Sequence, residues 1–255
     1  MQKIDTIVLA GAPAGAEMAP DAAQASRAMI ELGRKTMLQW VVDALRGSSS
    51  VGRIAVVGDV VADGLDLVLE PGESMVANMR SGIEALGAKG HVLIVSSDIP
   101  LLTSQAVDDF IERSAKLGVD LAYPILPKAH CEVRYPGLKR TYLRTADGVF
   151  TGGNLMLVRP EFILDNWGII MEAYSARKHV LKLARMIGMG VLARVLVAWV
   201  CPCVLKISML ERSVGRMLGA SVAAVVSAYP EIGEDVDKPS DVEAVREILA
   251  ASKGV

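Results

Sequence analysis

Short apolar runs alternate with amphipathic helical segments along most of this chain. Apolar, β-branched runs predict strands over residues 4–10, 53–58, 65–69, 91–96, 119–125, 155–158 and 222–226. Helical spacing of apolar residues predicts helices between several of these strands, over residues 36–45, 75–86 and 104–117. Ser74 suits the N-cap of the helix over 75–86, and Pro160 suits the first residue of a helix that follows the strand over 155–158. The alternation predicts an α/β fold, a three-layer α/β/α arrangement around a mainly parallel, Rossmann-like sheet with right-handed crossovers.

Two regions interrupt this alternation. Residues 126–150 are rich in Pro, Arg and Tyr, as expected of an inserted hairpin or substrate loop. Residues 161–220 have an almost wholly helical pattern, with helices expected over 175–188, 189–200 and 208–218. We therefore expect one domain over residues 1–255, with an inserted acceptor region at about 126–150 and a helical insertion at about 161–220.

The helical insertion also carries most of the excess hydrophobicity of the chain, in residues 187–205. A spanning helix needs about 20 mostly apolar residues, and this stretch is interrupted by Arg194 and Pro202. Three alternatives remain open for it: core packing, a homodimer surface and a peripheral contact with a membrane.

Charge and cysteine content narrow the class of protein. The formal net charge is −2, which argues against a nucleic-acid partner. Three cysteines, with only one residue between Cys201 and Cys203, suggest neither a disulfide framework nor a zinc site. No secretory signal is recognisable at the start, so we expect a cytoplasmic location, with membrane-peripheral attachment left open.

The segment from His91 to Leu102 contains the most informative carboxylate. A buried strand ends in two serines and then Asp98, which is followed by a proline turn. Ligands bind at the carboxyl ends of strands in open α/β sheets, and a carboxylate there suits a divalent cation carrying a nucleotide phosphate. The alternative is an aspartate that only caps the turn into the helix beginning near Thr103.

Two further features could meet Asp98 at this edge of the sheet. The loop after the first strand, Gly11 to Gly15, consists of small residues whose backbone N–H groups could approach a phosphate, although a tight turn explains it equally well. Near the end, Asp235 and Asp237 are spaced to share one face of an extended segment. Alternatively, these acids only favour the start of the helix that Ser240 and Glu243 would open with a capping box.

The order of these motifs resembles that of the sugar-nucleotide-type nucleotidyltransferases, in particular the molybdenum-cofactor guanylyltransferase-like NTP transferases with a glycosyltransferase-A-like fold. The resemblance rests on four segments: Ile7-Val-Leu-Ala-Gly11, Ile94-Val-Ser-Ser-Asp98-Ile-Pro100, Gly152-Gly-Asn154 and Asp235-Val-Asp237-Lys-Pro239. It implies a nucleotide-diphospho-sugar transferase type of sheet and Mg²⁺-dependent transfer of a nucleotidyl group from an NTP, with CTP or GTP favoured. The acceptor would be a phosphorylated small molecule, and pyrophosphate would be released.

The resemblance also implies roles for individual residues. Ala10, Gly11 and Gly15 would hold the triphosphate, and Ser74 and Gly82 would contact the base. Asp98 and Asp237 would bind Mg²⁺, and Arg27 would join them in catalysis. Gly153 and Asn154 would bind the acceptor. Apart from the resemblance, Arg140 could bind an anionic acceptor as part of a basic set that also includes Arg134, Lys139 and Arg144; the alternative is an ordinary charged surface.

Glu17 departs from the family pattern. It stands where an arginine normally meets the phosphates, and Arg27 stands where a lysine is usual. Arginine can bind phosphate in place of lysine, whereas glutamate repels it. Either another cation compensates, such as Arg27, Lys35 or Arg80, or the ancestral activity is lost or redirected.

Two alternative functions therefore stay open. The first is a nucleotide-binding protein of the same fold without turnover, which the glutamate at position 17 favours. The second is a glycosyltransferase that uses a sugar nucleotide. Such enzymes usually carry a pair of metal-binding acids around one residue, and Ser97-Asp98-Ile99 supplies a single acid.

Overall fold

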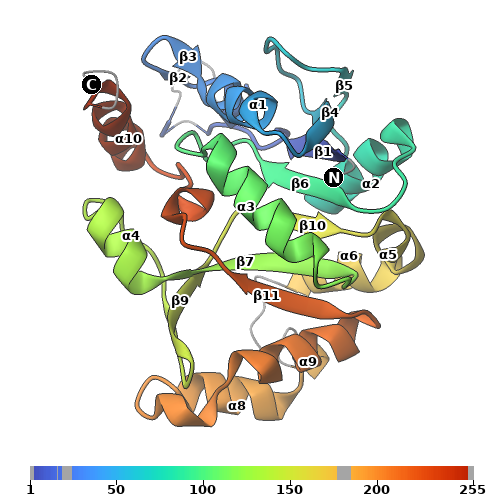
Figure 1. Cartoon of the computed structure of the whole chain (residues 1–255), viewed down its shortest axis with the longest axis vertical. Coiled ribbons are helices and arrows are strands. Elements are labelled where there is room, and N and C mark those ends of the chain that lie inside the picture. The colour runs from blue at the N-terminus through green and yellow to red at the C-terminus, as the bar shows by residue number, and fades with distance from the viewer. Residues whose placement is uncertain (1–2, 16, 19–24, 177–184, 252–255) are drawn as a thin grey trace.

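The computed structural model describes residues 3–15, 17–18, 25–176 and 185–251, and a nine-stranded mixed sheet runs through them (Figure 1). Its strands are β1 (Ile4–Leu9), β4 (Val51–Val57), β5 (Leu67–Leu69), β6 (Val92–Ser96), β7 (Leu121–Pro127), β8 (Leu143–Thr145), β9 (Gly148–Gly152), β10 (Leu155–Val158) and β11 (Val222–Val226). The short strands β2 (Glu31–Leu32) and β3 (Lys35–Thr36) form a separate pair. The helices are α1 (Met37–Gly47), α2 (Met75–Leu86), α3 (Ser104–Ala115), α4 (Lys128–Arg134), α5 (Pro160–Asp165), α6 (Trp167–Ala176), α8 (Met189–Val197), α9 (Ile207–Leu218) and α10 (Pro239–Ala251).

The predicted α/β class is confirmed, with a sheet that combines parallel and antiparallel parts. Strands β5, β4, β1 and β6 are parallel neighbours in that order. Strand β10 runs antiparallel between β6 and β7, β11 pairs with β7 in parallel, and β9 and β8 continue the sheet in antiparallel fashion. The carboxyl ends of β1 and β6 therefore lie side by side, as the sequence-based site requires.

Both faces of the parallel part are covered by helices, because its strands are apolar on both sides. Val8, Leu93 and Val95 pack against α1 and α3 on one face. Ile7, Val92 and Ile94 alternate with them and pack against α2 and α5 on the other. Burying each of these side chains contributes about 1.5–3 kcal/mol. This burial holds the sheet edge rigid where the site residues begin.

A two-residue irregularity between β9 and β10 places Gly153 and Asn154 at that edge. Gly152 on β9 pairs with Ile125, whereas Leu157 on β10 pairs with Ala122. The chain therefore advances five residues from Gly152 to Leu157 while β7 advances three. The irregularity lies opposite Pro124, which has no N–H to donate to the ladder. Gly153 still donates its N–H to the Pro124 carbonyl across 3.0 Å. Asn154 is thereby displaced from regular pairing.

Helix α10 fixes the last segment of the chain against the first half. Val242 and Val245 pack in a small cluster with Leu32 and Met37. The helix begins at Pro239, and Asp241 accepts hydrogen bonds from the N–H groups of the two residues before that proline. The predicted capping box at Ser240 is therefore wrong, because the neighbouring aspartate supplies the capping carboxylate.

The two irregular regions match their predictions in part. Residues 126–150 contain the expected hairpin, β8 and β9, but also the helix α4, which the pattern did not predict. In the helical region, α9 agrees with its prediction, and α8 ends at Val197, before the predicted Val200. The helix predicted over 175–188 falls largely on residues 177–184, which lie outside the described residues. Among the described ranges there is no helix long and apolar enough to cross a bilayer.

Candidate active site

Asp98 is held in a half-enclosed position at the carboxyl end of β6. The Ser96 hydroxyl donates to its Oδ1 across 2.5 Å, and the carboxylate-bearing side chain is 18% exposed. Burial raises the pKa of Asp98, although the Ser96 hydroxyl and the charge of Arg27 oppose the shift. The N-terminus of α3 is capped by Thr103, whose hydroxyl accepts from Ala106 N at 3.2 Å. Asp98 is therefore not the capping residue of that helix.

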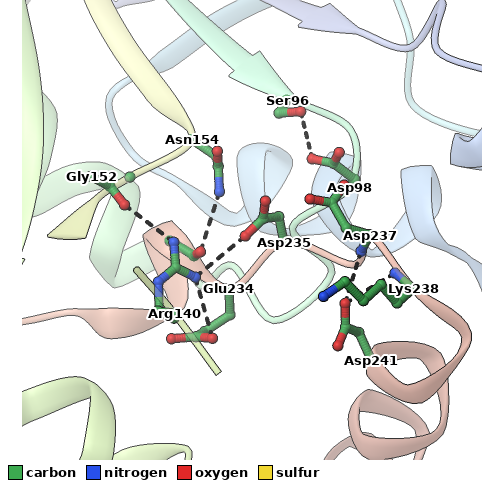
Figure 2. Close-up of polar contacts among 12 residues, drawn as sticks. Ser96, Asp98, Arg140, Gly152, Asn154, Glu234, Asp235, Asp237, Lys238 and Asp241 are labelled. Carbon is green, nitrogen blue, oxygen red and sulfur yellow. Dashed lines mark hydrogen bonds and ion pairs between the residues drawn. The ribbon is translucent and has the colours of Figure 1, made fainter. Parts of the chain in front are cut away.

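The chain end brings a second carboxylate to Asp98. Val236 donates its backbone N–H to the Asp98 carbonyl at 2.9 Å, so the segment carrying Asp237 lies against the end of β6. Figure 2 shows the side chains of Asp98 and Asp237 next to each other. Arg27 Nη1 lies 3.6 Å from Asp98 Oδ2 and forms an ion pair with Asp237 Oδ1. Two acids separated by 139 positions in the sequence therefore share one cationic group.

This donor set suits Mg²⁺. The ion takes oxygen ligands and is usually held by one or two carboxylates together with substrate phosphates. Asp98 and Asp237 supply the two carboxylates, and the positive group of Arg27 between them shows that the position favours a cation. Within the described ranges, no cluster of three or more His, Cys, Asp or Glu is arranged to hold an ion. The remaining ligands would therefore have to come from substrate and water.

Asp235 does not join that pair. Although the i, i+2 spacing predicts that Asp235 and Asp237 act on one face, Asp235 Oδ1 lies 3.4 Å from Arg140 Nη1. Burial also raises the pKa of Asp235, and the Arg140 guanidinium opposes the shift. Figure 2 shows the two aspartates directed to different partners.

The small-residue loop after β1 is fixed by the segment that carries Arg27. Ser26 donates its hydroxyl to the Ala10 carbonyl at 2.5 Å, and Arg27 donates its N–H to the Ala12 carbonyl at 2.8 Å. Gly15 has a φ of +78°, a conformation that favours glycine. The loop and Arg27 are thereby placed together, as a triphosphate site requires.

Asn78 is a site residue that the sequence-based reasoning missed. It is buried on α2 and accepts a hydrogen bond from Gly72 N at 2.6 Å. A Cβ at Gly11 would lie only 2.8 Å from Asn78 Nδ2, so only glycine fits there without displacement. The available signal was the four-residue spacing of Ser74, Asn78 and Gly82, which places all three on one helix face.

Ser74, at the start of α2, and Gly82, about two turns later, have different environments. Ser74 caps α2 by accepting from Ala77 N at 3.1 Å, and it lines the cavity described next. Gly82 is buried, and a Cβ there would meet Ile7 Cγ2 at 2.7 Å. The structure thus places Gly82 in the contact between α2 and β1, not beside Ser74, and its geometry gives no support to a base contact.

A cavity of about 530 Å³ lies between the loop after β1, the start of α2 and the start of β10. Its polar lining includes Gly11, Ser74, Asn78, Ser96, Asp98, Tyr123, Gly153 and Asn154. The cavity therefore brings together half of the residues predicted for nucleotide and acceptor, namely Gly11, Ser74, Gly153 and Asn154. Ala10, Gly15, Arg27 and Asp237 lie on the segments around it rather than in its lining.

Arg140 is held by acids and is not presented to the cavity. Its side chain is 10% exposed, and Nη1 lies 3.4 Å from both Glu234 Oε2 and Asp235 Oδ1. Nη2 donates to the Gly152 carbonyl at 3.2 Å. The acceptor-binding role predicted for Arg140 is therefore unsupported, because its guanidinium already joins the end of β9 to the segment that carries Asp237.

Glu234 is the buried member of this ion cluster. Its side chain is 2% exposed, and burial raises its pKa to about 7 even though Arg140 opposes the shift. Oε1 accepts no hydrogen bond from any described residue. Sequence reasoning could not identify Glu234, because nothing in its local pattern distinguishes it from an exposed acid.

Asn154 and Gly153 are positioned by backbone contacts at the cavity wall. Asn154 Nδ2 donates to the Gly233 carbonyl at 3.2 Å, and the Tyr123 hydroxyl donates to the Gly153 carbonyl at 2.7 Å. Burial raises the pKa of Tyr123, so its hydroxyl stays a donor at neutral pH. Tyr123, Gly153 and Asn154 line the same cavity as Gly11 and Asn78.

The other candidate cations point elsewhere. Lys35 pairs with Asp43 and Arg80 with Glu84, while Arg134 lies over the ring of Tyr135 at 5.7 Å. Arg144 donates to the Trp199 carbonyl at 2.7 Å, and Lys139 is exposed. Glu17 is also exposed. Of the three cations proposed to compensate for Glu17, Arg27 is the one that the structure brings to the acids.

Comparison with known families agrees with this geometry. The MobA-like NTP transferase domain matches residues 6–188, which include the loop after β1, Arg27, Asp98 and Asn154. The chain belongs to this family. The resemblance of its motifs to NTP transferases is thus confirmed, and the MobA-like domain identifies the chain as a nucleotidyltransferase.

Solved structures extend the comparison beyond the matched domain. A hypothetical transferase from Thermus thermophilus is 31% identical, with a TM-score of 0.83 over 94% of this chain and all of the other. CMP:2-keto-3-deoxy-manno-octonic acid synthetase complexed with CTP is 14% identical, with a TM-score of 0.59 over 99% of this chain and all of the other. The 2-C-methyl-D-erythritol 4-phosphate cytidylyltransferase from Thermus thermophilus is 15% identical, with a TM-score of 0.53 over 96% of this chain and 98% of the other. The last two share the fold. No curated protein matches the sequence.

Proposed function

We propose that this MobA-like nucleotidyltransferase is Mg²⁺-dependent and moves an NMP group from CTP or GTP to a phosphorylated small molecule, releasing pyrophosphate. The observation that carries the proposal is the convergence of Asp98 and Asp237 on one cationic group beside the cavity. Bound there, Mg²⁺ would neutralise negative charge on the triphosphate and on the departing pyrophosphate.

The residues around the loop after β1 would bind the triphosphate. Gly11 has no side chain to block approach, and Arg27 follows directly after the serine that fixes the loop. With the NTP bound, Arg27 would turn from the carboxylates to the phosphate oxygens, to which a guanidinium can donate two hydrogen bonds. In that position the guanidinium would stabilise the negative charge that develops on the leaving group.

The transfer itself balances without a covalent enzyme intermediate. An oxygen of the acceptor phosphate forms a bond to the α-phosphorus, and the bond from that phosphorus to the bridging oxygen breaks. Pyrophosphate leaves with the electron pair of the broken bond. A phosphate monoester is a sufficient nucleophile near neutral pH, so no side chain has to act as general base.

Different residues of the cavity lining would bind the nucleotide and the acceptor. Ser74 and Asn78 would face the base and ribose, while Gly153 and Asn154 would face the acceptor. CTP is favoured because two of the structural relatives carry CTP or cytidylyltransferase in their titles. GTP is retained because of the guanylyltransferase-like motifs. A phosphorylated acceptor agrees with the methylerythritol phosphate named for one relative.

The test is pyrophosphate release with each of the four NTPs, Mg²⁺ and a panel of sugar and alditol phosphates. We expect release with CTP or GTP and at least one acceptor, and none when EDTA removes the metal. The competing function is NTP binding without turnover, which Glu17 in the phosphate loop favours. Tight NTP binding with no pyrophosphate from any acceptor would support that alternative.

A further inference from the structure

Helix α8 exposes an apolar face to solvent. Met189, Leu196 and Val197 are 56%, 63% and 50% exposed and share one side of the helix. In the turn that follows, Trp199 and Val200 are 62% and 89% exposed. A surface helix normally presents polar residues on this side. We call these five residues the α8 patch.

The surroundings of the α8 patch are basic. Arg194 on the same helix is exposed, as are Arg185 before it and Lys206 after it. The sequence from Ala173 to Leu210 contains six Lys and Arg and no Asp or Glu, although the whole chain has 29 acids against 27 basic residues. The next acid, Glu211, accepts a hydrogen bond from Ala224 N at 2.8 Å. Three exposed basic residues, Arg185, Arg194 and Lys206, thus belong to or flank α8 in a stretch of sequence without acids.

We propose that the α8 patch binds the surface of an anionic lipid bilayer. An amphipathic helix with an apolar face and flanking Arg and Lys lies in the plane of such a surface, and a Trp side chain suits the headgroup boundary. A second copy of the chain fits less well, because a two-fold interface would bring the same basic residues of both copies together. The charge distribution thus selects negatively charged lipid over self-association.

The α8 patch does not line the cavity, although the strands β8 and β9 connect the two regions. Helix α8 lies at the end of the molecule opposite α1 and β5 (Figure 1). Arg144 on β8 donates to the Trp199 carbonyl at 2.7 Å, and β8 pairs with β9, which leads to Gly152 and the acceptor wall. The lipid-binding proposal nevertheless stands apart from the proposed reaction, since it rests on surface chemistry alone.

Co-sedimentation with vesicles tests the proposal. We compare pure phosphatidylcholine vesicles with equimolar phosphatidylcholine and phosphatidylglycerol, using the full chain and the double variant Leu196→Ser, Trp199→Ser. We expect binding to the anionic vesicles only, about tenfold weaker in the double variant and strongly reduced at about 0.5 M salt. Val61→Ser, Val133→Ser is the matched control, because both valines are more than three-quarters exposed and lie outside the patch.

The same variants separate the alternatives. NTP binding by the double variant shows that it is folded, so a loss of vesicle binding cannot be attributed to unfolding. The proposal is overturned if the native chain ignores anionic vesicles or if the double variant binds them equally well. It is also overturned if light scattering shows that the native chain is a dimer, that this dimer does not bind lipid, and that the double variant is a monomer.

Discussion

The backbone N–H of Val236 donates to the carbonyl oxygen of Asp98 across 2.9 Å, and this contact joins the segment of Asp98 to the segment of Asp237. Val236 itself is buried in the cluster beneath α10, so its position is set by packing as well as by the hydrogen bond. The residue that follows, Asp237, is thereby held beside the end of β6. The relative placement of Asp98 and Asp237 thus depends on the C-terminal helix as much as on the central sheet.

Removing either carboxylate should abolish turnover while leaving the fold intact. We expect Asp98→Asn and Asp237→Asn each to lower kcat by about 10²-fold or more, because each removes a ligand from the cation that stabilises the leaving group. Pyrophosphate release with the best NTP and acceptor pair is the measurement. Asp43→Asn is the control, since Asp43 is a half-exposed partner of Lys35 away from the cavity. Equal activity in all three variants would refute the assignment.

Arg27 should show both a charge effect and a geometry effect. We expect Arg27→Met to raise KM for the NTP and lower kcat, and Arg27→Lys to recover part of the loss. The charge of Arg27 also lowers the pKa of Asp98 against the effect of burial. Without it that pKa rises further, so the acid limb of the kcat/KM profile should move to higher pH in Arg27→Met than in Arg27→Lys. An unchanged acid limb of the kcat/KM profile in both variants would show that the charge of Arg27 does not influence the pKa of Asp98.

Two of the three glycines assigned to the nucleotide site, Gly11 and Gly82, should behave differently. Gly11→Ala places a methyl group against Asn78 and should weaken NTP binding by about tenfold with little loss of stability. Gly82→Ala instead meets Ile7 in the core and should destabilise the fold by about 1–3 kcal/mol, with NTP affinity nearly unchanged. Calorimetric NTP titration and denaturant unfolding of both variants make the comparison. If Gly82→Ala instead weakens NTP binding without loss of stability, Gly82 contacts the base as the sequence predicts.

Sequence reasoning located what is local and missed what depends on long-range packing. Asp98 could be found because a buried strand, two serines and a proline turn surround it, and the loop from Gly11 was recognisable by its small residues. The ion pairs of Arg140 were not predicted because an arginine in a basic stretch shows no sign of its acidic partners, which lie about 95 positions later. Asn78 was missed for the same reason, because its place in the site follows from its closeness to Gly11, 67 positions earlier in the sequence.

Arg140 should therefore matter for stability rather than for acceptor affinity. Its removal leaves Glu234 buried without its cation, and we expect Arg140→Met to destabilise the fold by about 3–5 kcal/mol at neutral pH. Denaturant unfolding monitored by circular dichroism measures the loss. The matched variant Lys139→Met removes an exposed neighbouring charge and should change stability little. A stable Arg140→Met protein with raised KM for the acceptor would instead support the original assignment.

Glu234 should give the protein a distinctive dependence of stability on pH. Its pKa in the folded state is about 7, above the ordinary value near 4.5, so the folded state binds its proton more tightly than the unfolded chain. The favourable contribution is complete below the unfolded pKa and is lost as pH rises through about 7, by roughly 3 kcal/mol. Glu234→Gln should lack this decline. If the free energy of unfolding changes with pH in the same way in the native protein and in Glu234→Gln, from about pH 4.5 to 8, the raised pKa does not belong to Glu234.

Binding of Mn²⁺ as a spectroscopic substitute for Mg²⁺ tests the central claim most directly. Electron paramagnetic resonance titrations in the presence of CTP or GTP count the bound ions and give their affinity in the native protein, Asp98→Asn and Asp237→Asn. We predict one Mn²⁺ per chain with nucleotide, and an affinity at least tenfold lower in each variant because each removes a carboxylate ligand. Unchanged Mn²⁺ affinity in both variants would show that the two acids do not share a metal ion.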